Sequence, residues 1–489
     1  MTEVAVVGGG VGGMAAAIRL AARGHRVQLF ERRGELGGKL AEMHLDGFTF
    51  GVGPSLLTLP AVFEALAAEA GRKLGELVTL EPVDPVCRYH FADGSVLAAR
   101  RDPAEMAAQV DRLAPGQGAA WLRYYRWGER CWAASERAFL SGPMDLAALP
   151  RRSAGLADLA ACAPGQTLAG HARRFFTDPR LIQYACRYAT YSGSSPYRAP
   201  AALGCIPYLE HAHGAWYVRG GLARLADALA VLLAEMGVEV HTGATVSRVL
   251  ADGGRVSGIT VDGQRVPAGV VVSGGDSARL YRDLYPDRAM RRRIGRLGPS
   301  SSGFLVLAGA RGRTRGLAQH NVYFSADYQA EFADIFGRRR LAADPTIYLG
   351  CSATADPAAA PAGQENLVLL VNVPAGGLGR WDWSPAEYQA LLLDRLAAAG
   401  TDVRGRLRCT ARLTPADLEQ RYDGWQGSIY GTAQHGRLAA FRRPGNRGPV
   451  RGLYLVGGSV HPGGGLPLVV IGSRIVADLV TADLAAGRV

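Results

Sequence analysis

Lysine is almost absent from this chain of 489 residues, because only Lys39 and Lys73 occur among its 55 basic residues. Against 43 acidic residues the formal net charge is +12, and arginine carries nearly all of the positive charge. The arginines are scattered, and no zinc-finger, homeodomain or RNA-recognition pattern occurs, so we expect no nucleic-acid partner. A coding preference for arginine explains the excess, and attraction to an anionic membrane surface is the functional alternative.

Cysteine is scarce and follows no pattern. Seven cysteines occur without a CxxC pair, which argues against a disulfide framework and against a structural zinc site and fits a reducing cytosol. His211 and His213 have the spacing of metal ligands on a strand, but no third ligand is evident, so we expect no metal. No basic leader precedes the apolar run that begins at Val4, so we expect no signal peptide.

A long uninterrupted hydrophobic run is also missing. The longest stretch without a charged residue, 452–473, contains Pro462, Pro467 and many glycines, which do not suit a helix exposed to lipid. Contact with a membrane is therefore expected to be peripheral. Hydrophobic residues make up 48% and charged residues 20% of the chain, which excludes a disordered or fibrous protein.

The N-terminus carries the strongest local motif. Residues 4–7 predict a strand, 14–23 a helix and 26–31 a second strand, with three spaced glycines, Gly8, Gly10 and Gly13, in the turn. The first glycine permits the tight turn, the second lets the backbone approach a pyrophosphate, and the third lets helix and strand pack closely. Glu31 ends the second strand, where it can accept hydrogen bonds from a ribose. The unit predicts a dinucleotide site at a helix N-terminus.

Strands and helices of the kind found in a cofactor domain occur again in the middle and near the end of the sequence. Residues 103–191 predict helices rich in aromatic residues, 238–275 a meander of strands, and 300–430 a mixture of strands and helices. A strand at 453–456 and a helix at 468–485 follow a pattern like that of the N-terminus. We therefore predict an α/β fold with a discontinuous Rossmann-like cofactor domain and an inserted helical and mixed α+β substrate domain. The expected cofactor segments are 1–100, 216–280 and 441–489, and the insertions are 101–215 and 281–440.

Further motifs carry a family resemblance. Gly37 and Gly38 form a glycine pair just after Glu31, which is typical of FAD folds of the glutathione-reductase and amine-oxidase type. Together with the stretches 47–60, 187–229, 321–336, 412–431 and 453–480, they make the chain similar to the bacterial-type carotenoid desaturases. The stretch RYATYSGSSPYRAP resembles the hydroxycarotenoid 3,4-desaturases more than the phytoene desaturases. One departure is Gly51, where the family often has Asp.

The resemblance implies FAD as the cofactor and extends the set of binding residues. N–H groups at the start of the last helix would face the negative charge that develops on a reduced flavin. The implied residues are Gly8, Gly10, Gly13, Glu31, Arg32, Gly38, Lys39, Gly53, Pro54, Val246, Gly458, Leu466, Pro467 and Leu468.

The implied activity is an FAD-dependent oxidoreductase that introduces a C-3,4 double bond into an acyclic, 1-hydroxylated carotenoid. Alternatives are a phytoene-type desaturase with several steps, a carotenoid isomerase, an amine oxidase-like flavoenzyme, and a carotenoid carrier without catalysis. The long carotenoid would enter from a membrane, so we expect a cytoplasmic protein bound peripherally to the inner face of the cell membrane. The final electron acceptor stays open between oxygen, a quinone and NAD(P).

Three residues are candidates for catalysis: Asp178, His211 and His461. Asp178 precedes Pro179 at the start of a helical run, so an N-cap is the favoured interpretation of this residue. The aromatic residues of 320–340 would line a tunnel, face a membrane or pack in the core, and core packing is favoured. The following Arg338, Arg339 and Arg340 fit either a headgroup contact or a solvated loop.

Overall fold

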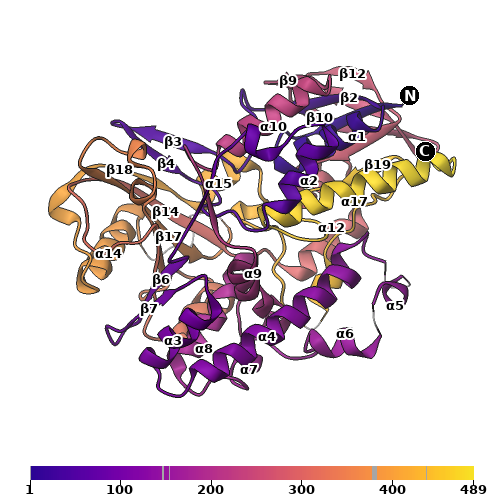
Figure 1. The fold of residues 1–489 in the computed structure, drawn as a ribbon. Helices are drawn as coiled ribbons and strands as arrows, with labels where there is room; N and C mark the ends of the chain where they lie inside the picture. Colours follow the sequence, from indigo (N-terminus) through magenta and orange to yellow (C-terminus); the bar gives the residue numbers. More distant parts are fainter. Residues whose placement is uncertain (1, 146–147, 154, 377–382, 437) are drawn as a thin grey trace.

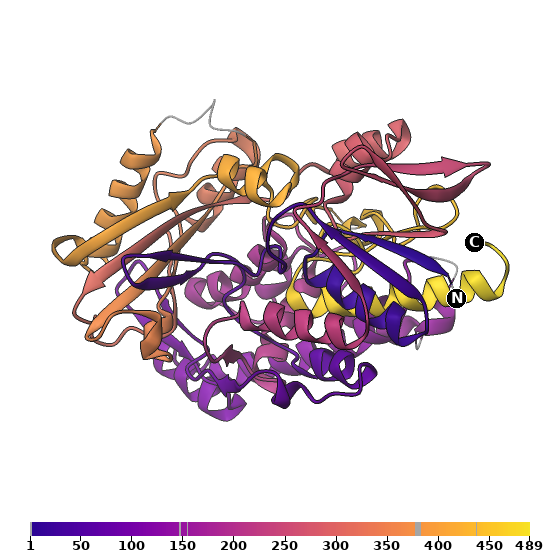
Figure 2. The same ribbon diagram turned by 90° about the horizontal axis from the view of Figure 1, so that it is seen from above.

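The computed structural model describes residues 2–145, 148–153, 155–376, 383–436 and 438–489. In Figure 1 a parallel sheet with its helices lies at the upper right, a larger mixed sheet lies at the left, and a group of helices lies below both. The two ends of the chain lie close to each other beside the parallel sheet in both ribbon views (Figures 1 and 2).

The parallel sheet is assembled from distant segments of the chain. Its strands, in spatial order, are β19 (Leu453–Leu455), β13 (Val270–Ser273), β1 (Glu3–Val7), β2 (Arg26–Glu31) and β9 (Glu239–Thr242). In register, Val4 of β1 lies opposite Val270 of β13 and Val27 of β2. Runs of valine suit strands that are buried on both faces. The N-terminal, central and C-terminal segments that were predicted to belong together thus contribute strands to one sheet.

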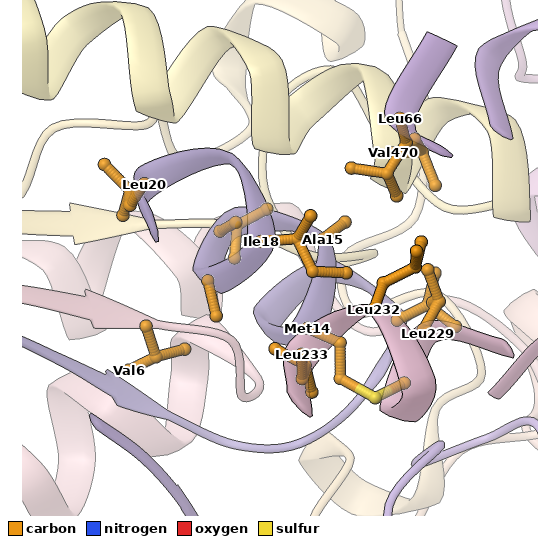
Figure 3. Close-up of a cluster of buried hydrophobic side chains, with 14 of the residues drawn as sticks. Val6, Met14, Ala15, Ile18, Leu20, Leu66, Leu229, Leu232, Leu233 and Val470 are labelled. Carbon is orange, nitrogen blue, oxygen red and sulfur yellow. The ribbon is translucent and has the colours of Figure 1, made fainter. Parts of the chain in front are cut away.

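Three helices pack around this sheet. Figure 3 shows Met14 and Ile18 of α1 (Val11–Ala22) among Leu229 and Leu232 of α10 (Arg224–Glu235) and Val470 of α17 (Leu466–Ala485). The first ten residues of α1 are all buried, because its glycines and alanines let the neighbouring helices approach closely. The helix that begins at the predicted dinucleotide turn is therefore held on all sides.

The meander predicted for 238–275 forms in part as a separate antiparallel sheet of β10 (Val246–Asp252), β11 (Arg255–Val261) and β12 (Gln264–Pro267). The first strand of that stretch, β9, pairs instead with β2 in parallel. Its last strand, β13, is fully buried in the parallel sheet, between β19 and β1.

The second large sheet is mixed and has seven strands. Their order is β18 (Leu407–Leu413), β14 (Ser302–Arg311), β17 (Gln364–Val373), β16 (Ile347–Gly350), β15 (His320–Tyr323), β6 (Cys87–His90) and β7 (Val96–Ala99). Helix α14 (Pro385–Ala398) packs on it through Leu392 and Leu396. Strands β6 and β7, which lie in the predicted first cofactor segment (residues 1–100), belong to this second sheet, since β6 pairs with β15 and β7 with β6.

The predicted helical insertion contains α3 (Pro103–Leu113), α4 (Gly118–Ser135), α7 (Leu168–Ala172), α8 (Pro179–Cys186) and α9 (Ile206–Ala212). Most aromatic residues of α4, such as Trp121 and Tyr124, are buried against this group, whereas Tyr125 is partly exposed. Phe324, Tyr328 and Phe332 belong to the same core, which confirms the interpretation of 320–340 as core packing.

The remaining elements are short or lie at the edges of these parts. They are β3 (Glu42–Leu45), β4 (Phe48–Gly51), β5 (Leu80–Pro82), β8 (Trp216–Val218), α2 (Ala61–Glu69), α5 (Leu149–Arg152), α6 (Leu156–Ala161), α11 (Ser277–Arg279), α12 (Arg288–Leu297), α13 (Tyr328–Ala333), α15 (Pro415–Tyr422) and α16 (Ala439–Arg442). Among the described residues, no helix has both the length and the apolar character that crossing a bilayer requires.

Candidate functional site

A cavity of about 520 Å³ joins the parallel sheet to the seven-stranded sheet. On one side it is lined by the turns that follow β1, β2, β13 and β19, and on the other by residues of β6, β15, β16 and β17. Ligands of parallel α/β sheets bind at the carboxyl ends of the strands, and this cavity lies there.

The turn after β1 forms the first wall. Gly8 has a φ of +101°, which favours glycine, and its N–H donates to the carbonyl of Phe30 (2.8 Å). A Cβ on Gly13 would lie 2.0 Å from the carbonyl oxygen of Gly8, so only glycine permits this contact between helix and strand. Gly10 lines the cavity as the N-cap of α1, which has no capping side chain and no acidic residue in its first turn. Its free N–H groups are therefore available to an anion.

Glu31 closes the end of β2 beside this turn. Its Oε2 accepts from the N–H of Gly9 (2.7 Å) and its Oε1 from the N–H of Arg33 (2.9 Å). The carboxylate lines the cavity and keeps further lone pairs for the hydroxyls of a ribose. Arg32 also lines the cavity, but its guanidinium pairs with Asp423 (3.3 Å) and donates to the carbonyl of Gln420 (2.8 Å).

The glycine pair after Glu31 brings a lysine into the cavity. Gly38 has a φ of +59°, and Lys39 donates from Nζ to the carbonyl of Ile429. Burial lowers the pKa of Lys39, and the charge of Asp276 opposes this shift. A Cβ on Gly53 would lie 1.7 Å from the carbonyl oxygen of Lys39, so this glycine fixes the position of the lysine; Pro54 lines the cavity next to it.

The C-terminal turn forms the opposite wall. Helix α17 begins after Gly465, and it too has neither a capping side chain nor an acidic residue in its first turn. Gly458, Leu466 and Pro467 line the cavity, as does Val246 of β10, whereas Leu468 lies outside the lining and packs against the helical core.

These observations test whether an FAD fits the site. Two uncapped helix N-termini open into one cavity, and glycines surround it where a side chain would fill the space. An extended ligand with a pyrophosphate and a planar ring matches this donor set. The residues that would hold it are Gly8, Gly10, Glu31, Arg32, Gly38, Lys39, Gly53, Pro54, Val246, Gly458, Leu466 and Pro467.

The three catalytic candidates do not line the cavity. Asp178 caps α8 by accepting from the N–H of Arg180 (2.8 Å) and pairs with its guanidinium (2.7 Å), which confirms the N-cap interpretation. His211 bonds through Nδ1 to the carbonyl of Arg101 (3.2 Å), and His461 through Nε2 to that of Gly142 (3.0 Å). Burial lowers the pKa of each histidine to about 4. We assign all three residues structural roles.

The wall formed by the second sheet contains polar residues that the sequence analysis did not single out. His320 bonds through Nδ1 to the hydroxyl of Tyr348 (2.7 Å), which donates to Ser55 Oγ (2.8 Å). Because the tyrosine hydroxyl donates its own proton to Ser55, this series of hydrogen bonds assigns the ring proton of His320 to Nδ1. Burial lowers the pKa of His320 to about 4, so the ring is neutral. Arg187, Thr190 and other residues of the stretch RYATYSGSS also line the cavity, although the sequence marked that stretch only as a family signature.

Glu331 on α13 is buried behind this wall. Its Oε2 accepts from Ser325 Oγ (2.8 Å) and Thr346 Oγ1 (2.7 Å), while Oε1 has no partner among the described residues. Burial raises the pKa of Glu331 from 4.5 to about 7, and the hydrogen bonds oppose this shift. The folded protein therefore binds this proton more tightly than the unfolded chain does.

Replacement of Glu331 by glutamine should change how stability depends on pH. The stability that the raised pKa provides is fully present below pH 4.5 and is lost as the pH rises through 7, by about 3 kcal/mol at most. Glu331→Gln should therefore unfold at a higher temperature than the wild type at pH 8 and at nearly the same temperature at pH 4.5. Thermal unfolding at both pH values tests this, with the exposed Glu129→Gln as control. An equal shift at both values would contradict it.

Comparison with known proteins agrees with this geometry. A family model described as flavin containing amine oxidoreductase matches residues 11–481. A 4,4'-diapolycopene oxygenase of Methylomonas sp is 35% identical over 99% of this chain and 98% of its own length. A 1-hydroxycarotenoid 3,4-desaturase of Flavobacterium sp. (strain P99-3) is 30% identical over 98% of this chain and 99% of its own length. Among solved structures, an oxidoreductase from Methanosarcina mazei superposes with a TM-score of 0.64 at 20% identity, over 97% of this chain and 100% of its own, and supports the fold alone.

Proposed function

Since the chain belongs to the flavin containing amine oxidoreductases, and within them to the bacterial-type carotenoid desaturases and oxygenases, we propose that it introduces a C-3,4 double bond into an acyclic, 1-hydroxylated carotenoid. It is an FAD-dependent oxidoreductase. The proposal rests on one continuous cavity, which runs from the glycine-lined turns to the wall of the second sheet. Such a cavity would bring a cofactor and an apolar substrate together.

The reaction removes two hydrogens from adjacent carbons of the polyene. FAD, when bound, supplies the acceptor for a hydride. The hydride leaves a carbon next to the conjugated chain, and the resulting cation is delocalised, so the neighbouring carbon loses its proton without a strong base. The chain itself contributes position and a dry environment: the backbone at Gly10 and Gly465 holds the cofactor, and Val322 and Leu370 form apolar parts of the facing wall.

The substrate also determines where the protein would work. A hydrocarbon of this length does not diffuse through water, so we propose that the protein collects it at the inner face of the cell membrane as a peripheral, cytoplasmic protein. The net charge of +12 favours an anionic surface. Arg338 and Arg340 pair with Asp334 (2.6 and 2.9 Å) and are therefore partly neutralised. Flotation with anionic vesicles, and its absence with neutral vesicles, would support this proposal.

Substrate conversion tests the proposed reaction. Purified protein loaded with FAD should bleach its oxidised flavin absorption under anaerobic conditions when a 1-hydroxylated acyclic carotenoid is supplied in liposomes. Chromatography should give a product with one more conjugated double bond. Restored flavin absorption after addition of oxygen, a quinone or NAD(P)⁺ would identify the electron acceptor.

Other products would redirect the assignment. Conversion of phytoene without conversion of the hydroxylated substrate would contradict the proposal and favour a phytoene-type desaturase. A product with a new oxygen atom would favour an oxygenase, and a geometric isomer an isomerase. Hydrogen peroxide formed from simple amines would point to an amine oxidase, and substrate binding without bleaching to a carrier.

A further inference from the structure

We propose that Arg187 binds the oxygen atom at the end of the carotenoid and thereby selects oxygenated substrates over hydrocarbons. This inference rests on the proposed function, because it takes a carotenoid as the occupant of the cavity. Arg187 opens the short helix η3 (Arg187–Ser192), directly after α8, and its side chain lines the cavity.

The guanidinium of Arg187 has no partner in the part of the chain that the structure describes. Among the described residues it makes no side-chain hydrogen bond and no ion pair, and its Nε is a buried donor without an acceptor. Arg88, Arg395 and Arg443 also have a buried Nε without an acceptor, but their terminal nitrogens are bonded: Arg88 donates to Gly316, Arg395 pairs with Asp344, and Arg443 donates to three backbone carbonyls. An arginine left unpaired in the interior is costly, so a ligand that accepts its hydrogen bonds would be favoured.

The carboxylates near Arg187 are already engaged elsewhere. Glu210 accepts from the hydroxyls of Tyr188 (2.8 Å) and Tyr191 (2.7 Å), and Glu331 is held by Ser325 and Thr346. Burial raises the pKa of Glu210, and the charge of Arg187 opposes this shift without forming an ion pair. The charge of Arg187 therefore acts on both carboxyl groups, but neither of them accepts a hydrogen bond from its guanidinium. The N–H donors of Arg187 are left for a ligand.

The position of Arg187 suits a reaction close to one end of the polyene. In a 1-hydroxylated carotenoid a single methylene separates the hydroxylated carbon from C-3, so the oxygen has to lie close to the reacting bond. Arg187 lines the same cavity as Tyr430, whose ring packs against Gly464 at the C-terminal turn. An oxygen bound by Arg187 would therefore lie in the cavity that the C-terminal turn also lines.

The chemistry of the side chain defines the class of ligand. A guanidinium has five N–H donors and no acceptor, so it binds a hydroxyl, an aldehyde or a carboxylate oxygen and gains nothing from a methyl group. A hydrocarbon end would leave these donors without partners. We therefore expect discrimination between two carotenoids that differ only in the terminal oxygen.

Arg187→Met tests the inference, because methionine keeps an unbranched apolar stem and removes every donor. With the hydroxylated carotenoid we expect kcat/KM to fall about 100-fold, mostly through KM, while the matched hydrocarbon is bound as well as by the wild type or better. Arg187→Lys should restore part of the loss. Arg198→Met, an exposed arginine of the same segment, should behave as the wild type. FAD content and the flavin absorption spectrum should be unchanged in all three variants.

A binding assay separates this inference from the proposed reaction. Titration of the oxidised protein with each carotenoid, followed by the shift of carotenoid absorption, measures affinity without turnover. If the wild type prefers the hydroxylated carotenoid and Arg187→Met loses that preference, the inference holds even when the reaction is not a 3,4-desaturation. If Arg187→Met lowers the affinity for both carotenoids equally, or releases FAD, then Arg187 stabilises the fold or the bound cofactor and the inference is wrong.

Discussion

Purified Gly10→Ala protein should fold normally and yet be nearly colourless, with an affinity for FAD about 100-fold below that of the wild type. Gly10 has a φ of −73°, which alanine adopts without strain, and the nearest other protein atom to an added Cβ is 4.0 Å away. The methyl group therefore meets no protein atom and occupies space that the pyrophosphate needs. Flavin absorbance of the purified protein and titration of the apoprotein with FAD measure the effect.

Two neighbouring glycines provide the comparison. Gly34→Ala places its methyl group in open space and should keep full flavin content. Gly13→Ala would bring a Cβ to 2.0 Å from the carbonyl oxygen of Gly8, so it should lose the fold and the flavin together. The thermal stability of apo Gly10→Ala should fall by less than about 1 kcal/mol, the usual cost of alanine at an N-cap. Full flavin content in Gly10→Ala would remove Gly10 from the cofactor site.

Arg443→Met should destabilise the protein by about 3 kcal/mol and release FAD more readily. Arg443 is only 2% exposed, and it donates to the carbonyls of Tyr430 (3.2 Å), Thr432 (3.2 Å) and Gly458. It thereby ties the segment at 430–432 to the turn after β19, and both segments line the cavity. Methionine would leave three carbonyl groups without donors, which outweighs the relief of the desolvation that lowers the pKa of Arg443 to about 10.

The adjacent arginine is a matched control for this prediction. Arg442 is exposed, so Arg442→Met removes the same charge and similar volume without breaking an interior hydrogen bond of its side chain. The melting temperature of the Arg442→Met protein and its rate of FAD release should equal those of the wild type. Equal effects of the two substitutions would mean that the loss of charge, and not the three carbonyl contacts, explains the result.

The parts of the fold that were predictable are those with local signals. Runs of valine in β1 and β13, spaced glycines at Gly8, Gly10 and Gly13, and an alanine-rich helix are properties of neighbouring residues, so they can be recognised in the chain. Strands β6 and β7 have only four residues each; β7 pairs with β6, and β6 is placed by its pairing with β15, far away in the sequence. For this reason the sequence did not reveal that the last strands of the segment 1–100 join the second sheet.

In the candidate site, too, some residues were predictable from local signals and others were not. The cofactor turns were predictable because backbone geometry demands glycine at fixed spacings. His211 and His461 were candidates by residue type alone, and residue type does not tell whether a ring faces a cavity or a carbonyl in the core. Arg187 was missed for the opposite reason: an arginine among so many carries no signal until the structure shows that it lines the cavity and has no partner among the residues described.

In the parallel sheet the interior strand β13 pairs with β1 on one side and on the other with β19, the last strand that the structure describes. During translation, β1 and β13 therefore leave the ribosome long before β19 and α17 exist. Until then one edge of β13 has no partner and α1 lacks the helix that covers it. A nascent chain must keep these apolar surfaces shielded, and loading of the flavin has to wait until β19 and α17 have been synthesised.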